Sequence, residues 1–220
     1  HSCVKNVTFR NVIMPKTFKG IYIKNRPSGA PGKSGEITNI LYQNITISDA
    51  NQWPIWIGPQ QAFAPTFGDA CPLLWPSKRF EDLVCFMDEY VTFSDIKFKD
   101  IFIKNAKFSP GVILGPDNNP FIDFDFDNVV VDNPQTLQFD DFYYCENAEN
   151  AVYRRGTFPV PKCFAPASTC DVENDKLCAY GYFCGGVESE ACEICPMGSY
   201  CPDGLNQMNC PIGTTTEDIG

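Results

Sequence analysis

The chain repeats one pattern of apolar and polar positions four times. The repeats are residues 4–14, 37–47, 93–103 and 121–131, and they read VKNVTFRNVIM, ITNILYQNITI, FSDIKFKDIFI and FIDFDFDNVVV. Apolar residues occupy the fourth, sixth, ninth and eleventh places of each repeat, and Asn or Asp occupies the third and eighth. Repetition of one unit indicates an architecture in which equivalent segments stack on one another.

A straight strand could not place all four apolar residues of a repeat on the same face. Side chains alternate between the two faces of a strand, but here the alternation slips by one residue between the sixth and ninth places. Asn and Asp tolerate the left-handed backbone that a sharp turn requires. We therefore predict two short strands that meet at a corner, with all four apolar places inside. The predicted corners are Asn11, Asn44, Asp100 and Asn128.

A second apolar segment follows three of the repeats, at residues 20–24, 54–58 and 111–115. Apart from an insertion at about residues 59–88, equivalent segments recur after 28 to 33 residues without an amphipathic helix between them. This spacing is typical of stacked coils in which each strand pairs in parallel with its counterpart. We predict an all-β fold with a parallel β-helix at residues 1–165. A β-sandwich is less favoured, because the Asn-Gly and Asp-Gly turns of short hairpins are missing.

Stacking of the third and fourth repeats places Lys97 beside Asp125 and Lys99 beside Asp127 on the outer face. Opposite charges on adjacent strands attract each other, so we predict a ladder of ion pairs. Asp123, Asp125 and Asp127 are also residues of the type that binds calcium. The lysine neighbours favour the ladder, and no metal site is predicted.

Composition narrows the possible partners. A formal net charge of −10 and a pI of about 4.5, without a cluster of Lys or Arg, argue against nucleic acid and anionic membrane surfaces. No apolar stretch is as long as a membrane span, so no membrane insertion is predicted within the chain. Twelve cysteines beside a single His indicate disulfides and an oxidising compartment. We expect a secreted or cell-surface protein.

A change of composition marks a second module at residues 166–220. Seven of the twelve cysteines lie between Cys170 and Cys210, and a module with so little apolar surface needs disulfides in place of a core. A redox-active pair at Cys192 and Cys195 is less favoured, because it lacks a βαβ setting, and a zinc site is less economical than disulfides. Five cysteines before the boundary and seven after it are odd counts. Either one bridge crosses the boundary, with Cys3 and Cys210 as candidates, or further chain supplies partners.

Two disulfides are predicted in the first module. A bridge between Cys71 and Cys85 would close the insertion, which gains from covalent closure, and one between Cys145 and Cys163 would staple the end of the coils. The cysteines expected in disulfides are Cys71, Cys85, Cys145, Cys163, Cys170, Cys178, Cys184, Cys192, Cys195 and Cys201.

The segments VKNVTFRN, GIYIKN, ITNILYQNITI and PIWIGP at residues 4–58 resemble, in order and spacing, the C-terminal coils of polygalacturonase-type glycoside hydrolases. The resemblance implies a right-handed parallel β-helix of the pectin-lyase-like kind. In that family a Gly-Ile-Arg-Ile-Lys motif lines the substrate cleft, and here the motif reads Gly-Ile-Tyr-Ile-Lys. Lys24 thus matches the substrate-binding lysine and Tyr22 replaces the arginine, which makes both candidates for substrate binding.

The catalytic motifs of the same family are missing from the chain. Hydrolysis with inversion needs two carboxyl groups, which the family supplies from Asn-Thr-Asp and Asp-Asp motifs upstream of the cleft motif. The pair Asp140-Asp141 lies in a later coil, and we predict no catalytic residue and no cofactor. Aromatic residues can stack on sugar rings or simply pack within the structure, and the sequence leaves both roles possible for five of them. These are Trp53, Trp56, Trp75, Tyr143 and Tyr144.

The second module carries a resemblance of its own. CAYGYFC, EICPMGSYCPDG and NCPIGTTT resemble small Cys-Pro-x-Gly repeats of receptor and surface-protein ectodomains, and we expect the chain to continue beyond residue 220. Two sequons, at Asn6 and Asn44, are candidate glycosylation sites. Asn6 is the better acceptor, because a corner asparagine such as Asn44 is expected to bond to its stacked neighbours.

Together these features favour a noncatalytic extracellular protein used in surface architecture, adhesion or glycan binding, such as a component of a surface filament or appendage. Its expected partners are glycans or polysaccharides and other extracellular protein subunits. One alternative is a glycoside hydrolase of the polygalacturonase type whose catalytic coils lie upstream of His1. The other is a protein-recognition ectodomain in which the coils are a spacer.

Overall fold

The computed structural model describes residues 2–25, 34–62, 71–72, 89–134, 141–171, 176–185 and 191–210. Its regular elements are β-strands, and no helix is present within these residues. The prediction of an all-β fold is therefore confirmed.

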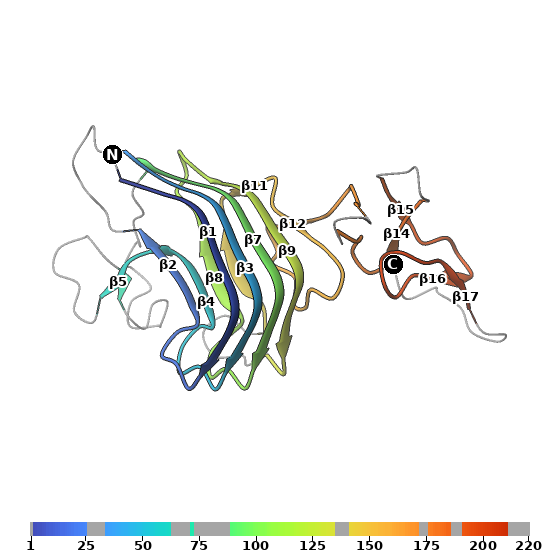
Figure 1. Ribbon diagram of the computed structural model, residues 1–220, viewed down its shortest axis with the longest axis horizontal. Coiled ribbons are helices and arrows are strands. Elements are labelled where there is room, and N and C mark those ends of the chain that lie inside the picture. The colour runs from blue at the N-terminus through green and yellow to red at the C-terminus, as the bar shows by residue number, and fades with distance from the viewer. Residues whose placement is uncertain are drawn as a thin grey trace.

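Four long strands form the larger sheet and pair in parallel, in chain order. They are β1 (Ser2–Pro15), β3 (Gly35–Ser48), β7 (Val91–Lys104) and β9 (Phe121–Asp132). The register sets Val4 opposite Ile37 and Ile37 opposite Phe93, so equivalent places of successive repeats lie side by side, as predicted (Figure 1). Short strands continue the sheet beyond β9, namely β11 (Ala148–Glu149), β12 (Val152–Tyr153) and β13 (Ala165–Pro166).

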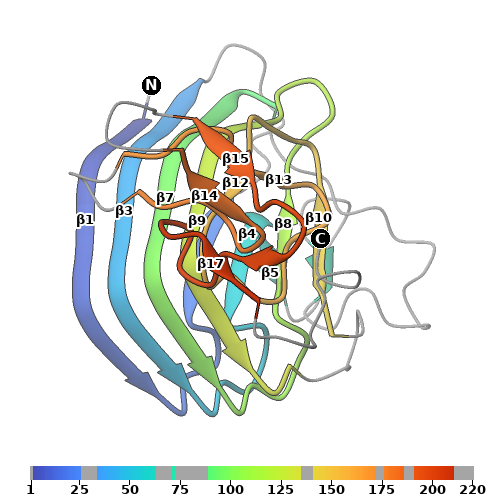
Figure 2. The ribbon, with the colours of Figure 1, turned by 90° about the vertical axis from the view of Figure 1, so that its right-hand side faces the viewer.

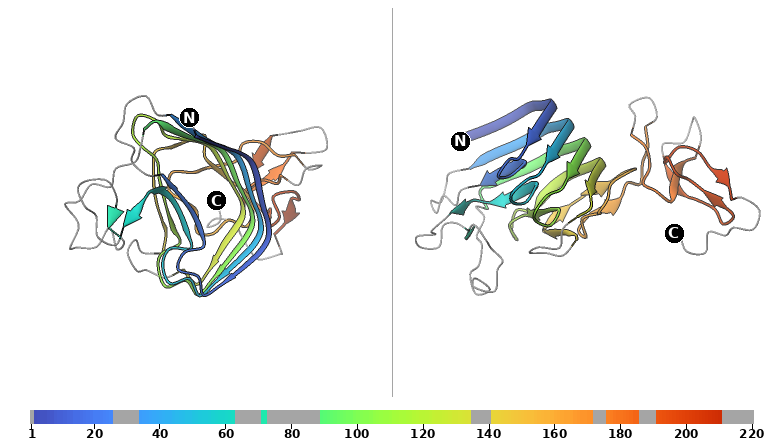
Figure 3. Two further views of the ribbon diagram at one scale, coloured as in Figure 1. Left: turned by 60° about the vertical axis from the view of Figure 1, so that its left-hand side comes forward. Right: turned by 90° about the horizontal axis from the view of Figure 1, so that it is seen from below.

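A smaller parallel sheet lies opposite the larger one. Its strands are β2 (Ile21–Asn25), β4 (Ile55–Pro59), β8 (Gly111–Leu114) and β10 (Tyr143–Glu146), paired in the order β10-β8-β4-β2. Along the chain, strands of the larger sheet alternate with strands of the smaller one. Each turn of the chain therefore adds one strand to each sheet, as the left view of Figure 3 shows. The described part of the insertion adds a two-stranded parallel pair, β5 (Gln61–Ala62) with β6 (Cys71–Pro72).

Residues in the left-handed region bend every long strand. The predicted corners at the eighth place of the repeat have φ values between 52° and 58°, which confirms them. The third place also has positive φ in all four strands, and so does the residue two positions past each repeat, as in Asn105 and Asn133. Bends therefore recur every five residues. The Asn and Asp residues at the third place already indicated the additional bend, because few other residues adopt this conformation at low cost.

Side-chain amides connect the corners of neighbouring strands. Asn39 Nδ2 donates to Asn6 Oδ1, and Asn44 Nδ2 donates to Asn11 Oδ1, each at 2.7 Å. Between β7 and β9 the acceptor at this corner is an aspartate: Asn128 Nδ2 donates to Asp100 Oδ1 at 2.7 Å. Asn and Asp thus both permit the bend and bond to the equivalent residue one strand away.

The core lies between the two sheets. Because the strands bend, the apolar places fourth, sixth, ninth and eleventh in the repeat all point inward, as predicted. In β7 and β9 these side chains expose at most 2% of their surface, and each buried Phe stabilises the fold by roughly 2–3 kcal/mol. The residues concerned are Ile96, Phe98, Ile101, Ile103, Phe124, Phe126, Val129 and Val131.

Among the described residues, strand β1 forms one end of the larger sheet and has β3 as its single neighbour. Phe9 on β1 stacks on Tyr42, which stacks on Phe98, with ring centroids 4.9 and 5.2 Å apart. Phe9 exposes 44% of its surface, whereas Phe98 at the same place of the repeat is fully buried. The difference follows from position, since the inner face of an end strand lacks a neighbour on one side.

The cysteine-rich segment lies beyond the other end of the sheets, and Figure 2 views the molecule from that side. It contains two antiparallel pairs, β14 (Tyr182–Cys184) with β15 (Cys192–Ile194) and β16 (Ser199–Tyr200) with β17 (Met208–Asn209). Three disulfides hold it, and buried apolar side chains other than cysteine are few within its described residues. This agrees with the predicted disulfide-rich region.

The corner at Asn39 provides a test of this construction. Asn39→Ala is expected to lower the free energy of unfolding by about 1–3 kcal/mol, because Ala is strained at φ 54° and loses the bond to Asn6. Asn39→Gly should restore much of this loss, since Gly adopts the left-handed conformation freely. Urea unfolding of both variants measures the difference. Equal destabilisation by Ala and Gly would contradict a conformational role for this corner.

Candidate functional site

The residues proposed from the cleft motif lie on β2, at one end of the smaller sheet. Tyr22 points away from the core and is half-buried, while Lys24 is exposed. The Tyr22 hydroxyl accepts a hydrogen bond of 3.1 Å from the Gln61 backbone amide, and the Lys24 Nζ lies 5.7 Å from the centre of the Tyr22 ring. The ring is therefore held in place by a neighbouring segment and has a cation close to it.

A second lysine, missed in the sequence, completes this group. The Lys19 Nζ lies 4.9 Å from the centre of the Tyr22 ring and 4.8 Å from that of Phe18, and it donates to Gln52 Oε1. Burial, together with repulsion from Lys24, lowers the pKa of Lys19 to about 8. No carboxylate forms an ion pair with Lys19 or Lys24 among the described residues. We call Lys19, Tyr22 and Lys24 the lysine pair site.

Most of the aromatic residues considered for sugar stacking are structural instead. Trp53, Trp56 and Tyr143 are fully buried, so none of them presents a ring face to solvent. Trp53 and Trp56 pack with Phe108 outside the smaller sheet. Tyr144 is half-buried and its hydroxyl donates to Glu146, and Trp75 lies outside the described residues. A platform built from Trp53, Trp56 and Tyr143 is therefore wrong, because apolar packing takes both faces of the rings.

The predicted charge ladder is right in register but only partly right in its ion pairs. Lys97 is opposite Asp125 and Lys99 is opposite Asp127 in the pairing of β7 with β9. The Lys99 Nζ lies 3.9 Å from Asp127, as expected, but Lys97 pairs with Asp95 at 2.7 Å. Lys97 reaches this carboxylate on its own strand because an arginine already occupies Asp125.

That arginine and its neighbour directly follow β12 in the chain. The Arg154 Nε donates to both oxygens of Asp125, at 3.2 and 3.0 Å, and Arg155 Nε donates to Asp127 at 3.4 Å. Arg154 Nη1 also donates to the Thr169 carbonyl at 2.7 Å, which ties the sheet to the start of the cysteine-rich segment. The calcium alternative loses support here, because guanidinium groups already neutralise these carboxylates.

Asp127 is buried within this network. Burial raises the pKa of its carboxyl to about 6, against the attraction of Arg155 and Lys99. The pKa and the position are unusual for a carboxylate, but two cations surround the group and only 5% of Asp127 is exposed. Its role is therefore structural.

The described cysteines form four disulfides. Cys145 is bonded to Cys163 in the sheet region, and the tail pairs are Cys170–Cys184, Cys178–Cys192 and Cys195–Cys201. The Cys170, Cys178 and Cys184 sulfurs lie within 4.8 Å of one another, but each belongs to a disulfide and so offers no thiolate to a metal. Cys3 and Cys210, the candidates for a bridge across the boundary, have no disulfide. The expected bridge from Cys71 to Cys85 lies outside the described residues.

The sequence also singled out an acidic pair and two sequon asparagines. Asp141 is exposed, while Asp140 and His1 lie outside the described residues. Both sequon asparagines are exposed and occupy left-handed corners. They differ in their amide groups: Asn44 Nδ2 donates to Asn11, whereas Asn6 takes part in its ladder through Oδ1.

Glycosylation is expected at Asn6 and not at Asn44. The glycan attaches to Nδ2, and at Asn44 this atom lies between stacked corners and bonds to Asn11. Peptide mapping after secretion from a eukaryotic host should find glycan on the Asn6 peptide alone. Asn6→Gln should then remove all N-glycan, and Asn44→Gln should leave it unchanged. A glycan found only on Asn44 would refute this assignment.

The Asp127 carboxyl is expected to make stability fall as the pH rises. Its folded pKa of about 6 lies above its ordinary value of 3.8, so the folded protein binds the proton more tightly than the unfolded chain. The stabilisation is complete below pH 4 and is lost as the pH rises through 6. In the wild type the free energy of unfolding should fall by about 3 kcal/mol between these pH values, and Asp127→Asn should abolish this decrease. Urea unfolding across this pH range tests it, and identical slopes would contradict the assignment.

No helix that could cross a membrane is found in the described part of the chain. No protein-family model, no curated protein and no solved structure matches the chain. The likeness to polygalacturonases therefore rests on the quoted sequence motifs.

Proposed function

We propose that this is a noncatalytic extracellular protein that binds acidic glycans and serves in surface architecture or adhesion. The observation that carries the glycan-binding part is the lysine pair site. Two ammonium groups lie 4.9 and 5.7 Å from the centre of one tyrosine ring, and neither forms an ion pair with a carboxylate in the described residues.

The electrostatics of the site favour an anionic ligand. Lys19 and Lys24 repel each other, which contributes to the lowered pKa of Lys19. A carboxylate that accepts hydrogen bonds from both ammonium groups relieves this repulsion and forms charge-assisted bonds. A uronic acid residue offers such a carboxylate next to a sugar ring. The lysine that the polygalacturonase resemblance assigns to substrate binding, Lys24, is one of the two.

We further propose that the two sheets form a right-handed parallel β-helix of the polygalacturonase-like kind. Parallel strands of one sheet joined by crossovers are right-handed in nearly all proteins, because strand twist favours that hand. The parallel pairing of equivalent repeats supports this interpretation. A stack of this kind presents the same outer positions at regular intervals, which suits a rod in a surface assembly.

The pairing of the outer carboxylates supports the noncatalytic part of the proposal. Inverting hydrolysis needs two carboxyl groups that flank the scissile bond, one as acid and one to activate water. Within the described residues two of the carboxylates on β9, Asp125 and Asp127, are paired with arginines. They belong to the larger sheet, whereas Lys24 is on the smaller one. The extracellular location is supported by the disulfides, which persist in oxidising compartments.

Binding of oligogalacturonate tests the proposal. Lys24→Ala and Lys19→Ala should each weaken binding by about tenfold or more, because a hydrogen bond to a charged group contributes about 1.5–3 kcal/mol. Affinity should also fall as the pH rises through about 8, where Lys19 loses its charge. Isothermal titration calorimetry measures both effects.

The matched control is Lys97→Ala, which removes the same charge from the outer face of the larger sheet and should leave binding unchanged. Equal loss of affinity in this control would mean that net charge, and not the lysine pair site, is responsible. Release of reducing ends from polygalacturonate by the wild-type protein would overturn the noncatalytic part of the proposal.

A further inference from the structure

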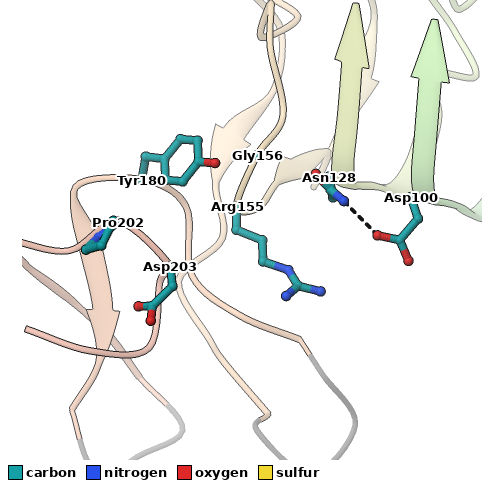
Figure 4. A pocket seen from close by; sticks show the side chains of 7 residues that line it. All are labelled: Asp100, Asn128, Arg155, Gly156, Tyr180, Pro202 and Asp203. Atoms are coloured by element: carbon teal, nitrogen blue, oxygen red, sulfur yellow. Dashed lines mark hydrogen bonds between the residues drawn. The ribbon is translucent and has the colours of Figure 1, made fainter.

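A cleft of about 310 Å³ lies where the sheets meet the cysteine-rich segment, and Figure 4 shows its lining. One wall comes from the outer corners of β7 and β9 and the chain after β12. The other comes from the loops of the disulfide-bonded segment. The lining residues are Asp100, Asn128, Arg155, Gly156, Tyr180, Pro202 and Asp203. The volume is at the lower end of the range for small-ligand sites, about 300–1,000 Å³.

The sheet wall is polar and fixed. The Asp100 Oδ1 accepts the 2.7 Å bond from Asn128, while its Oδ2 has no hydrogen-bond partner in the described part of the chain. Gly156 lies next to Asn128 with φ 69°, and a side chain at this position would collide with the Asn128 Oδ1. The corner ladder and the glycine therefore hold an acceptor oxygen at the mouth of the cleft.

The opposite wall combines an aromatic ring with an oriented carboxylate. Tyr180 is 59% exposed, and Pro202 lies beside it in the lining. The Asp203 Oδ1 accepts from the backbone amides of Leu205 and Asn206, at 2.9 and 2.7 Å, and its Oδ2 accepts from Asn206 Nδ2 at 2.7 Å. Although burial opposes it, these bonds hold the pKa of the Asp203 carboxyl below its ordinary value, so the group stays ionised.

The charges in the lining restrict the ligand class. Arg155 is drawn between the two walls in Figure 4, and its guanidinium disfavours a metal cation. Asp100 and Asp203 give the lining a negative excess, because the charge of Arg155 is already balanced by Asp127, and this excess disfavours a polyanion. Few lining residues are apolar, so a hydrocarbon ligand gains little. The remaining class is a neutral ligand that has many hydroxyl groups and one apolar face.

We propose that this cleft binds a neutral saccharide, with a pyranose ring on Tyr180 and its hydroxyl groups on Asp100, Arg155 and Asp203. A pyranose has an apolar face of axial C–H bonds that fits a flat ring, and each hydroxyl both donates and accepts. The carboxylates accept from it and the guanidinium donates to it. This site is separate from the lysine pair site. It binds neutral glycans, whereas the lysine pair site binds acidic ones.

The test uses cellotetraose, chitotetraose and maltotetraose as neutral probes with the whole protein. At least one should bind with a millimolar dissociation constant, measured by saturation-transfer difference NMR and titration. Tyr180→Ala should weaken binding by about tenfold or more, whereas Tyr180→Phe should keep most of it because the ring remains. Failure of all three probes to bind at millimolar concentration would overturn the proposal.

Two controls establish whether binding of the neutral probe depends on this cleft alone. Tyr200→Ala removes a tyrosine of the same segment that is absent from the cleft lining, and it should leave binding unchanged. The double variant Lys19→Ala/Lys24→Ala should also bind the neutral probe normally, even if oligogalacturonate binding fails. Equal binding by Tyr180→Ala and the wild type would refute a stacking role. Near-UV circular dichroism checks that the Tyr180 variants keep the native fold.

Discussion

The rest of the structure depends on left-handed corners that recur every five residues along the long strands. Without them, strict alternation would send half of the apolar places of each repeat into water. Asn and Asp carry this conformation at lower cost than other residues with side chains, and their oxygens and amides bond to the equivalent corner one strand away. One residue type thus fixes both the bend of each strand and the register of its neighbour.

The same constraint determines where chemistry becomes possible. Inward places are filled by Ile, Phe and Val, so functional groups are confined to outward places, corners and connections. The lysine pair site lies on a connection and on the outer face of the smaller sheet. The cleft lies at the corners of the larger sheet, where Asp100 and Asn128 have a structural bond and also face an adjoining segment. The lysine pair site carries an excess of positive charge, whereas the cleft carries an excess of negative charge.

Arginines link the sheet region to the disulfide-bonded segment. Arg154 is nearly buried, joins Asp125 of β9 to the Thr169 carbonyl, and therefore crosses from the last long strand to the next module. A buried pair of this kind is costly to break, because loss of one partner leaves an uncompensated charge. The link therefore connects the larger sheet to the segment that carries the second wall of the cleft.

The sequence by itself determined the all-β class, the parallel stacking of the repeats, the corners at the eighth place and the pairing of Lys99 with Asp127. These properties follow from a repeated pattern, and a repeated pattern can be recognised in the amino-acid sequence. Only the tertiary structure showed that Lys19 lies near the Tyr22 ring and that Arg154 forms the ion pair with Asp125. It also showed that Tyr180 and Asp100 line the same cleft. These contacts join residues in connections of irregular length, which no repeat predicts. The disulfide partners in the tail belong to the same class, since spacing alone does not fix connectivity. The backbone preference of the corner residues therefore makes the fold predictable from the sequence. The candidate sites are not predictable in this way, because folding brings together residues that are far apart in the chain.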